Sequence, residues 1–66
     1  MTITVNGEPR QVDDHATVAM LLRELNLAPR RVAVEVNLEL VPREQQDQFA
    51  LREGDALEVV TLVGGG

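Results

Sequence analysis

Apolar and polar residues alternate along the first five positions of the chain, which is typical of a strand with one buried face. Isoleucine and valine take turns with threonines over residues 1–5. Asn6-Gly7 follows, and this dipeptide is a strong signal for a tight turn. We therefore predict a hairpin of residues 1–5 and 8–12. Because Pro9 has no N–H to donate, the second strand is expected at a sheet edge.

The spacing of the apolar residues then changes to that of a helix. Four of them fall at i, i+3, i+4 and i+7, on one helical face: Val18, Leu21, Leu22 and Leu25. Thr17 is a suitable N-cap. Asn26 and Pro29 are expected to end the helix, because Asn tolerates the left-handed conformation and Pro cannot continue the hydrogen-bond ladder. A domain this small needs the apolar stripe for its own core, so we favour a buried face over a partner-binding helix.

The second half of the chain predicts further strands separated by polar turns. Valines alternate with other residues over 31–36, and a short strand is expected over 38–41. The polar run 43–48 suits one loose helical turn, with Phe49 and Leu51 as anchors in the core.

The last apolar run, residues 56–63, carries apolar side chains at most positions of both faces. This pattern is typical of a strand that is flanked and covered rather than at an edge. We therefore place this strand in the middle of the sheet. The whole pattern predicts a small α+β roll with one helix on one face of the sheet.

Three glycines, Gly64, Gly65 and Gly66, close the chain directly after this run. Without Cβ atoms they form a thin thread whose terminal carboxylate can enter a tunnel that a branched residue would block. A frayed terminus or a linker remnant is the alternative reading, although such linkers usually carry serine or follow polar residues. We expect a folded domain over residues 1–63, a flexible tail over 64–66, and any chemistry at the carboxylate of Gly66.

Size and composition exclude several classes of function. A chain of 66 residues has no room for an enclosed active site. Acidic residues outnumber basic ones 11 to 6, which disfavours nucleic acid and favours a basic protein surface as partner. Cysteine is absent, so disulfides and thiolate metal sites are excluded. No apolar run approaches the roughly 20 residues that cross a bilayer, and we expect a cytoplasmic protein that is monomeric when free.

The titratable residues do not predict a catalytic or metal site. His15 is the only imidazole and lies beside Asp13 and Asp14 in an expected turn, where a lone histidine is usually solvated. Several carboxylates are available for acid–base work, but nothing in so short a chain builds a pocket around them: Glu35, Glu39, Asp47, Glu53, Asp55 and Glu58. We therefore expect no bound metal or cofactor and no independent enzyme.

Several short motifs, taken in order, resemble the ThiS family of sulfur carriers in thiamine biosynthesis. They are Thr4-Val5-Asn6-Gly7-Glu8, Thr17-Val18 with Leu21-Leu22, Val34-Glu35-Val36-Asn37, Val41-Pro42-Arg43, Glu53-Gly54-Asp55-Ala56-Leu57-Glu58 and the diglycine end. Each motif is weak alone, but their order, their spacing and the chain length together are fairly specific. The family commonly ends in two glycines, which Gly65 and Gly66 match, and Gly64 lies where the family varies.

The resemblance implies a ubiquitin-like β-grasp fold, with a mixed sheet of about five strands, one helix across one face and a flexible C-terminal tail. It also implies that an ATP-dependent activating enzyme of the ThiF type adenylates Gly66, which is converted to a thiocarboxylate with sulfur from a donor. The carrier would then pass sulfur to a thiazole synthase of the ThiG type. The element Val41-Pro42-Arg43 favours this branch over the small subunit of molybdopterin synthase. A ubiquitin-like protein modifier and a plain interaction module remain open alternatives.

Partner contacts are expected from basic and apolar residues near the family-like elements. Arginine suits a bidentate grip on a carboxylate, and Arg43 lies in the element that favours the thiamine branch. For Arg30 and Arg31 we favour a balance of local charge. Leu62 and Val63 are candidates for an apolar docking patch, although burial in the last strand explains them equally well.

Overall fold

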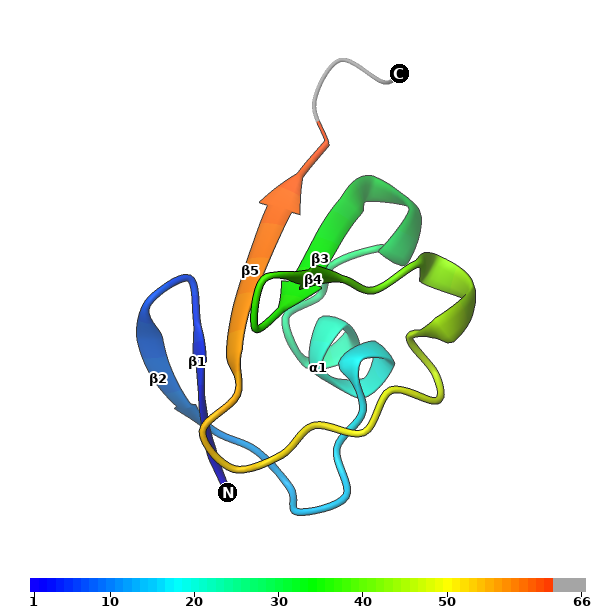
Figure 1. The fold of residues 1–66 in the computed structure, drawn as a ribbon. Coiled ribbons are helices and arrows are strands. Elements are labelled where there is room, and N and C mark those ends of the chain that lie inside the picture. Colours follow the sequence, from blue (N-terminus) through cyan, green and yellow to red (C-terminus); the bar gives the residue numbers. More distant parts are fainter. Residues whose placement is uncertain (63–66) are drawn as a thin grey trace.

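The computed structural model describes residues 1–62, in which a five-stranded mixed sheet packs against one helix (Figure 1). The elements are β1 (Thr2–Val5), β2 (Glu8–Gln11), α1 (Val18–Glu24), η1 (Pro29–Arg31), β3 (Val32–Val36), β4 (Glu39–Leu40), η2 (Arg43–Gln45) and β5 (Ala56–Thr61), where η marks a 3₁₀ turn. The strand order is β2-β1-β5-β3-β4. The last strand is therefore central, parallel to β1 and antiparallel to β3, as predicted.

The first hairpin is closed by the tight turn that the sequence predicts. Asn6 has φ 52° and Gly7 has φ 85°, so both central residues are left-handed, and the turn joins Val5 directly to Glu8. Positive φ at both positions matches the right-handed twist of the strands and favours Asn-Gly. β2 lies at the sheet edge, where Pro9 costs the ladder little.

Helix α1 begins and ends at the predicted signals. The Thr17 hydroxyl accepts a hydrogen bond from the Met20 N–H at 3.2 Å, which satisfies one of the free donors of the first turn. Asn26 takes φ 59°, and the Leu27 N–H then donates to the Leu22 carbonyl at 2.9 Å. This is the Schellman arrangement, which turns the chain back over the last helical turn.

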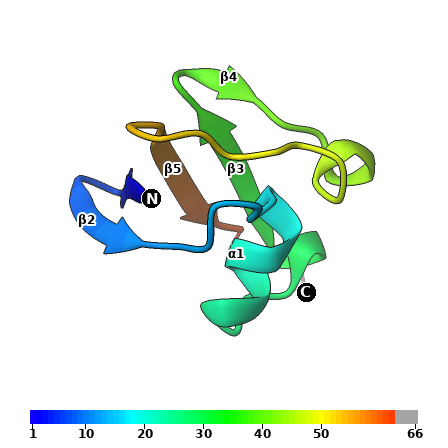
Figure 2. The same cartoon turned by 90° about the horizontal axis from the view of Figure 1, so that it is seen from below.

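The core lies between α1 and the sheet face that the helix covers, as Figure 2 shows from below. Its fully buried side chains come from all parts of the fold: Ile3, Val18, Leu21, Leu22, Val34 and Leu57. Three residues of the predicted helical stripe are buried, whereas Leu25 at the helix end is only partly buried. Burial of aliphatic side chains on this face supplies the main driving force for folding.

The prediction that the last strand is covered on both faces was wrong. Ala56 and Glu58 are exposed, and Val60 retains 58% of its accessible surface. The reason is that α1, with seven residues, is the only α-helix among residues 1–62 and lies on one face of the sheet. Within those residues β5 is therefore flanked by strands on both edges but covered by a helix on one face only.

The segment after β4 packs against the start of α1 through its backbone. The Ala19 N–H donates to the Gln46 carbonyl at 3.1 Å, and the Val18 N–H donates to the Phe49 carbonyl at 3.0 Å. Leu51 is buried and Phe49 half-buried, which confirms both as anchors. Gln46 is 3% exposed, although it lies in a polar run that predicts exposure. Its burial follows from its position against the first turn of α1, which the sequence pattern does not reveal.

The β3–β4 turn contains a strained residue. Leu38 has φ 72° and is 86% exposed, so it has a left-handed backbone with no burial to offset the crowding at its Cβ. This conformation costs a non-glycine residue about 1–2 kcal/mol. We expect Leu38→Gly to raise the free energy of unfolding by about 1 kcal/mol, since relief of the crowding exceeds the added freedom of the unfolded chain.

Urea unfolding of both proteins measures this difference. Leu40→Gly, on β4 two residues away and without a left-handed backbone, is the control and should be no more stable than the original chain. Equal stability of Leu38→Gly and the original chain would contradict the prediction.

Candidate functional site

The central strand carries the chain to its C-terminal end. The Leu62 N–H donates to the Arg31 carbonyl at 2.7 Å, which extends the pairing of β5 with the β3 side by one residue. The turn η1 therefore lies beside the point where the chain passes into its last four residues. Val63, Gly64, Gly65 and Gly66 lie outside the described residues, so their predicted roles as tail and attachment site remain predictions.

Two left-handed asparagines hold β5 by side-chain mimicry of a neighbouring strand. Asn6 accepts from the Val59 N–H through Oδ1 at 2.8 Å and donates to the Val59 carbonyl through Nδ2 at 3.2 Å. On the other edge, Asn37 Oδ1 accepts from the Ala56 N–H at 3.0 Å, and its Nδ2 donates to Asp55 Oδ1 at 3.0 Å. Both edges of the strand are thus fixed beyond the regular ladders.

The sheet face away from α1, which we call the open face, carries exposed aliphatic side chains near the end of β5. Leu62 is 52% exposed and Val60 58% exposed, and the two lie in phase because strand side chains alternate. Leu40 is 64% exposed on β4, level with Glu58 and away from the end of β5. Of the two alternatives left open for Leu62, burial in the strand does not hold, and its role in docking remains a prediction. A patch of this kind beside a chain end marks a surface for protein contact.

Two carboxylates lie within the open face. Glu35 lies directly opposite Glu58 in the β3–β5 ladder and opposite Leu40 in the β3–β4 ladder. Like charges on neighbouring strands repel each other, which a basic group of a partner would relieve. The open face therefore carries two carboxylates on β3 and β5, one step along the ladder from Val60 and its partner Ala33, in keeping with the net charge of −5.

The structure places Arg31, and not Arg43, next to Leu62, the last described residue. Arg43 is exposed on η2, after β4, and β3 lies between β4 and β5 in the sheet. Arg30 and Arg31, for which the sequence favoured local charge balance, lie on η1 next to Leu62. One feature of the sequence could have indicated this placement: both arginines come just before a strand that runs antiparallel to the last one.

The remaining candidates have structural contacts. The His15 side chain is exposed, and the backbone N–H of His15 donates to Asp13 Oδ1 at 2.8 Å within the turn. Glu53 accepts from the Thr2 N–H at 2.9 Å, and Asp55 accepts from the Arg52 N–H at 2.8 Å. Within residues 1–62, no three acidic or histidine side chains come together as metal ligands. The same part of the chain holds no helix long and apolar enough to cross a membrane.

The fold and the delivery of the C-terminal end from the central strand define a small ubiquitin-like β-grasp protein. The ThiS family model matches residues 3–66, and the chain belongs to the ThiS family. A solved structure of a thiamine biosynthesis protein (ThiS) from Geobacter metallireducens superposes with a TM-score of 0.84. It is 40% identical and covers 100% of both chains.

Curated relatives agree with this assignment. The chain is 32% identical to the sulfur carrier protein ThiS of Escherichia coli (strain K12) over the full length of both, and 36% identical to that of Thermus thermophilus over 97% of this chain and 98% of the relative. It is also 47% identical to a thiazole synthase of Paramagnetospirillum magneticum. That similarity covers the whole of this chain, which spans only 20% of the length of the thiazole synthase.

The asparagine contacts generate a testable prediction. We expect Asn6→Gly to lower the free energy of unfolding by about 1 kcal/mol, because the left-handed backbone is kept while both side-chain bonds to Val59 are lost. Asn26→Gly is the matched control, since Asn26 has φ 59° and its side chain makes no hydrogen bond to another residue among 1–62. Urea unfolding should show a change of no more than a few tenths of a kcal/mol for this control. Equal effects of the two variants would contradict the role assigned to Asn6.

Proposed function

We propose that this domain is a sulfur carrier of thiamine biosynthesis and that the carboxylate of Gly66 is the group that carries sulfur. The observation that supports this most directly is the full-length similarity to two proteins named sulfur carrier protein ThiS. The arrangement of the sheet agrees with it, because the last four residues directly follow a central strand that is hydrogen-bonded on both edges.

The chemistry follows from the reactivity of a carboxylate. A carboxylate is a poor electrophile, so one oxygen of the Gly66 carboxylate attacks the α-phosphorus of ATP, and pyrophosphate leaves. A sulfide-level sulfur atom supplied by the donor then attacks the acyl carbon and AMP leaves, so that a thiocarboxylate remains. An activating enzyme of the ThiF type binds ATP and holds the reacting groups in place. The carrier binds no cofactor of its own.

A thiocarboxylate suits a carrier without cysteine. It is ionised at neutral pH, whereas a thiol with a pKa near 8.5 is mostly protonated there, so the thiocarboxylate is the better sulfur nucleophile. The proposed acceptor is a thiazole synthase of the ThiG type. Support comes from two thiazole synthases that contain a region 47% and 42% identical to this whole chain. The dependence on ATP and on these enzymes assigns the carrier to the cytoplasm.

The residues of the domain then have the task of docking rather than catalysis. The open face supplies Val60 and Leu62 near the end of β5, and the carboxylates of Glu35 and Glu58 on the same face favour a basic group on the partner. Docking on this face places the last four residues at the active centre of the partner enzyme. The slender glycine end needs only reach and a free carboxylate.

Intact mass tests the carrier function. Incubation of the purified chain with a ThiF-type activating enzyme, ATP and a sulfur donor should replace one oxygen of the chain by one sulfur. A chain without Gly65 and Gly66 should remain folded, because residues 1–62 contain the sheet, the helix and the core, and it should gain no sulfur. An unchanged mass of the full chain with every cognate activating enzyme would contradict the proposal.

Docking through the open face is tested by the introduction of a charged side chain among its apolar residues. We expect Leu62→Asp to raise the dissociation constant for the activating enzyme about tenfold or more, since a desolvated carboxylate would replace an apolar contact. Met20→Asp, at an exposed position on α1, is the matched control and should change the constant less than about twofold. Titration calorimetry measures both constants. Equal effects of the two variants would exclude the open face as the docking surface.

A further inference from the structure

β5 continues past the tip of the β1–β2 hairpin and presents an unpaired main-chain edge (Figure 1). Because the Leu62 N–H bonds to the Arg31 carbonyl, Leu62 faces β3 and its neighbour Thr61 faces the β1 side. β1 serves β5 only as far as residue 57, and the Asn6 side chain serves Val59. Within residues 1–62, the N–H and the carbonyl of Thr61 therefore have no partner.

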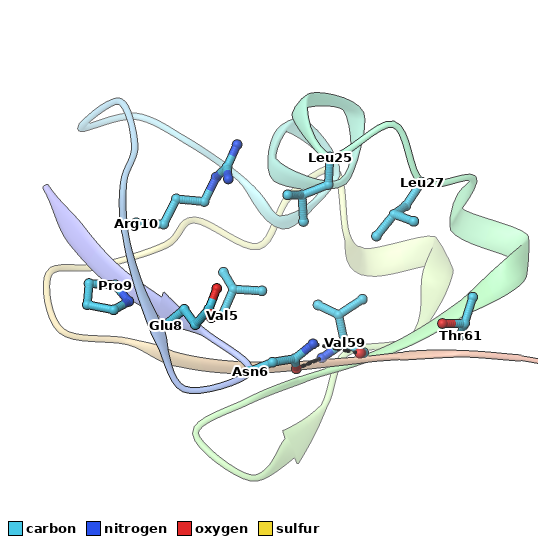
Figure 3. Close-up of a pocket in the computed structure, with 9 residues that line it drawn as sticks. All are labelled: Val5, Asn6, Glu8, Pro9, Arg10, Leu25, Leu27, Val59 and Thr61. Carbon is cyan, nitrogen blue, oxygen red and sulfur yellow. Dashed lines mark hydrogen bonds between the residues drawn. The ribbon is translucent and has the colours of Figure 1, made fainter.

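A cleft of about 470 Å³ lies next to this edge, between the hairpin, the end of α1 and β5. Figure 3 shows four aliphatic side chains converging on it, with Thr61 toward one end and Arg10 toward the other. The four are Val5, Leu25, Leu27 and Val59, and each is partly buried. The sheet and the helix end thus leave an apolar gap open to solvent, which is large enough for an aliphatic side chain.

The polar groups of the cleft favour a neutral acceptor over an anion. Arg10 Nε is buried and has no hydrogen-bond partner among the described residues. Glu24 lies 3.7 Å from the Nη2 atom of the same guanidinium, and Glu8 lines the cleft. Two carboxylates beside one arginine leave the site negative, which disfavours a carboxylate or phosphate ligand. A main-chain carbonyl suits the Nε–H donor, because it accepts a hydrogen bond without bringing a charge.

We propose that the cleft binds an extended segment of a partner protein, which adds as a short strand to the free edge of β5 at Thr61. Main-chain hydrogen bonds to Thr61 and Arg10 Nε hold the segment, and one of its aliphatic side chains fills the gap between Leu27 and Val59. The inference deepens the proposed function and rests on it, because the partner is the enzyme that receives the C-terminal end, five residues beyond Thr61.

Amide hydrogen exchange tests the strand addition directly. The exchange rate of the Thr61 amide is measured by NMR in the free ¹⁵N-labelled chain, then with an excess of the ThiF-type activating enzyme, and separately with the thiazole synthase. We expect exchange at Thr61 to slow about tenfold or more with at least one of the two enzymes. The Leu38 amide, in the β3–β4 turn, is the internal control and should keep its rate.

A substitution separates the edge from the side chain. Thr61→Pro removes the edge donor but no ladder hydrogen bond, because the N–H of residue 61 faces away from β3. We expect it to raise the dissociation constant of the protecting enzyme about tenfold or more, whereas Thr61→Val, which keeps the N–H, stays within about twofold. Arg10→Lys keeps the charge, loses the buried Nε–H and should weaken binding in the same direction. Urea unfolding checks that each variant is folded.

Unchanged Thr61 exchange with both enzymes, together with tight binding of Thr61→Pro, would overturn the inference. Sulfur gained by the original chain in the intact-mass experiment would then show that the carrier function stands without it. Failure of the carrier function is recognised separately, because the original chain would gain no sulfur at all.

Discussion

The structure depends on the hydrogen bonding of one strand, β5, along both of its edges. β5 is last in the chain but central in the sheet, so its pairing with β1 closes a contact between the two ends of the sequence. Asn6 and Asn37 extend this pairing with side-chain amides in place of further strand residues. The strand is thereby held on the β1 side up to Val59 and on the β3 side up to Leu62.

Within residues 1–62, one short α-helix makes the two faces of the sheet different, because it covers only one of them. α1 buries Val18, Leu21 and Leu22 against one face, which supplies the core of a domain near the lower size limit for independent folding. The other face retains Val60 and Leu62 in solvent beside the C-terminal end. In a larger domain a second layer would cover these residues. Here these two side chains stay exposed on the same face as Glu35 and Glu58.

Much of the fold was predictable because local signals and tertiary contacts agree. Asn6-Gly7, Thr17 and Asn26 each determine a local backbone conformation, and all three act as predicted. Strand ends differ by one or two residues, since pairing partners decide where a ladder stops. The candidate site was predictable only in part. Leu62 was named from its place beside the tail and is exposed, whereas the position of Arg31 next to it was not predicted, because sequence does not reveal that η1 adjoins the end of β5.

The sequence by itself determined the periodic elements, the turns between them, the central place of the last strand and the resemblance to the ThiS family. These properties depend on neighbouring residues or on a pattern along the whole chain, which a single sequence contains. Only the tertiary structure decided which face of β5 is covered, that Gln46 is buried, and that a cleft with an unpaired edge lies beside Thr61. Each of these depends on how the elements pack against one another in space. This packing brings together residues that are distant in sequence, and no local pattern records it.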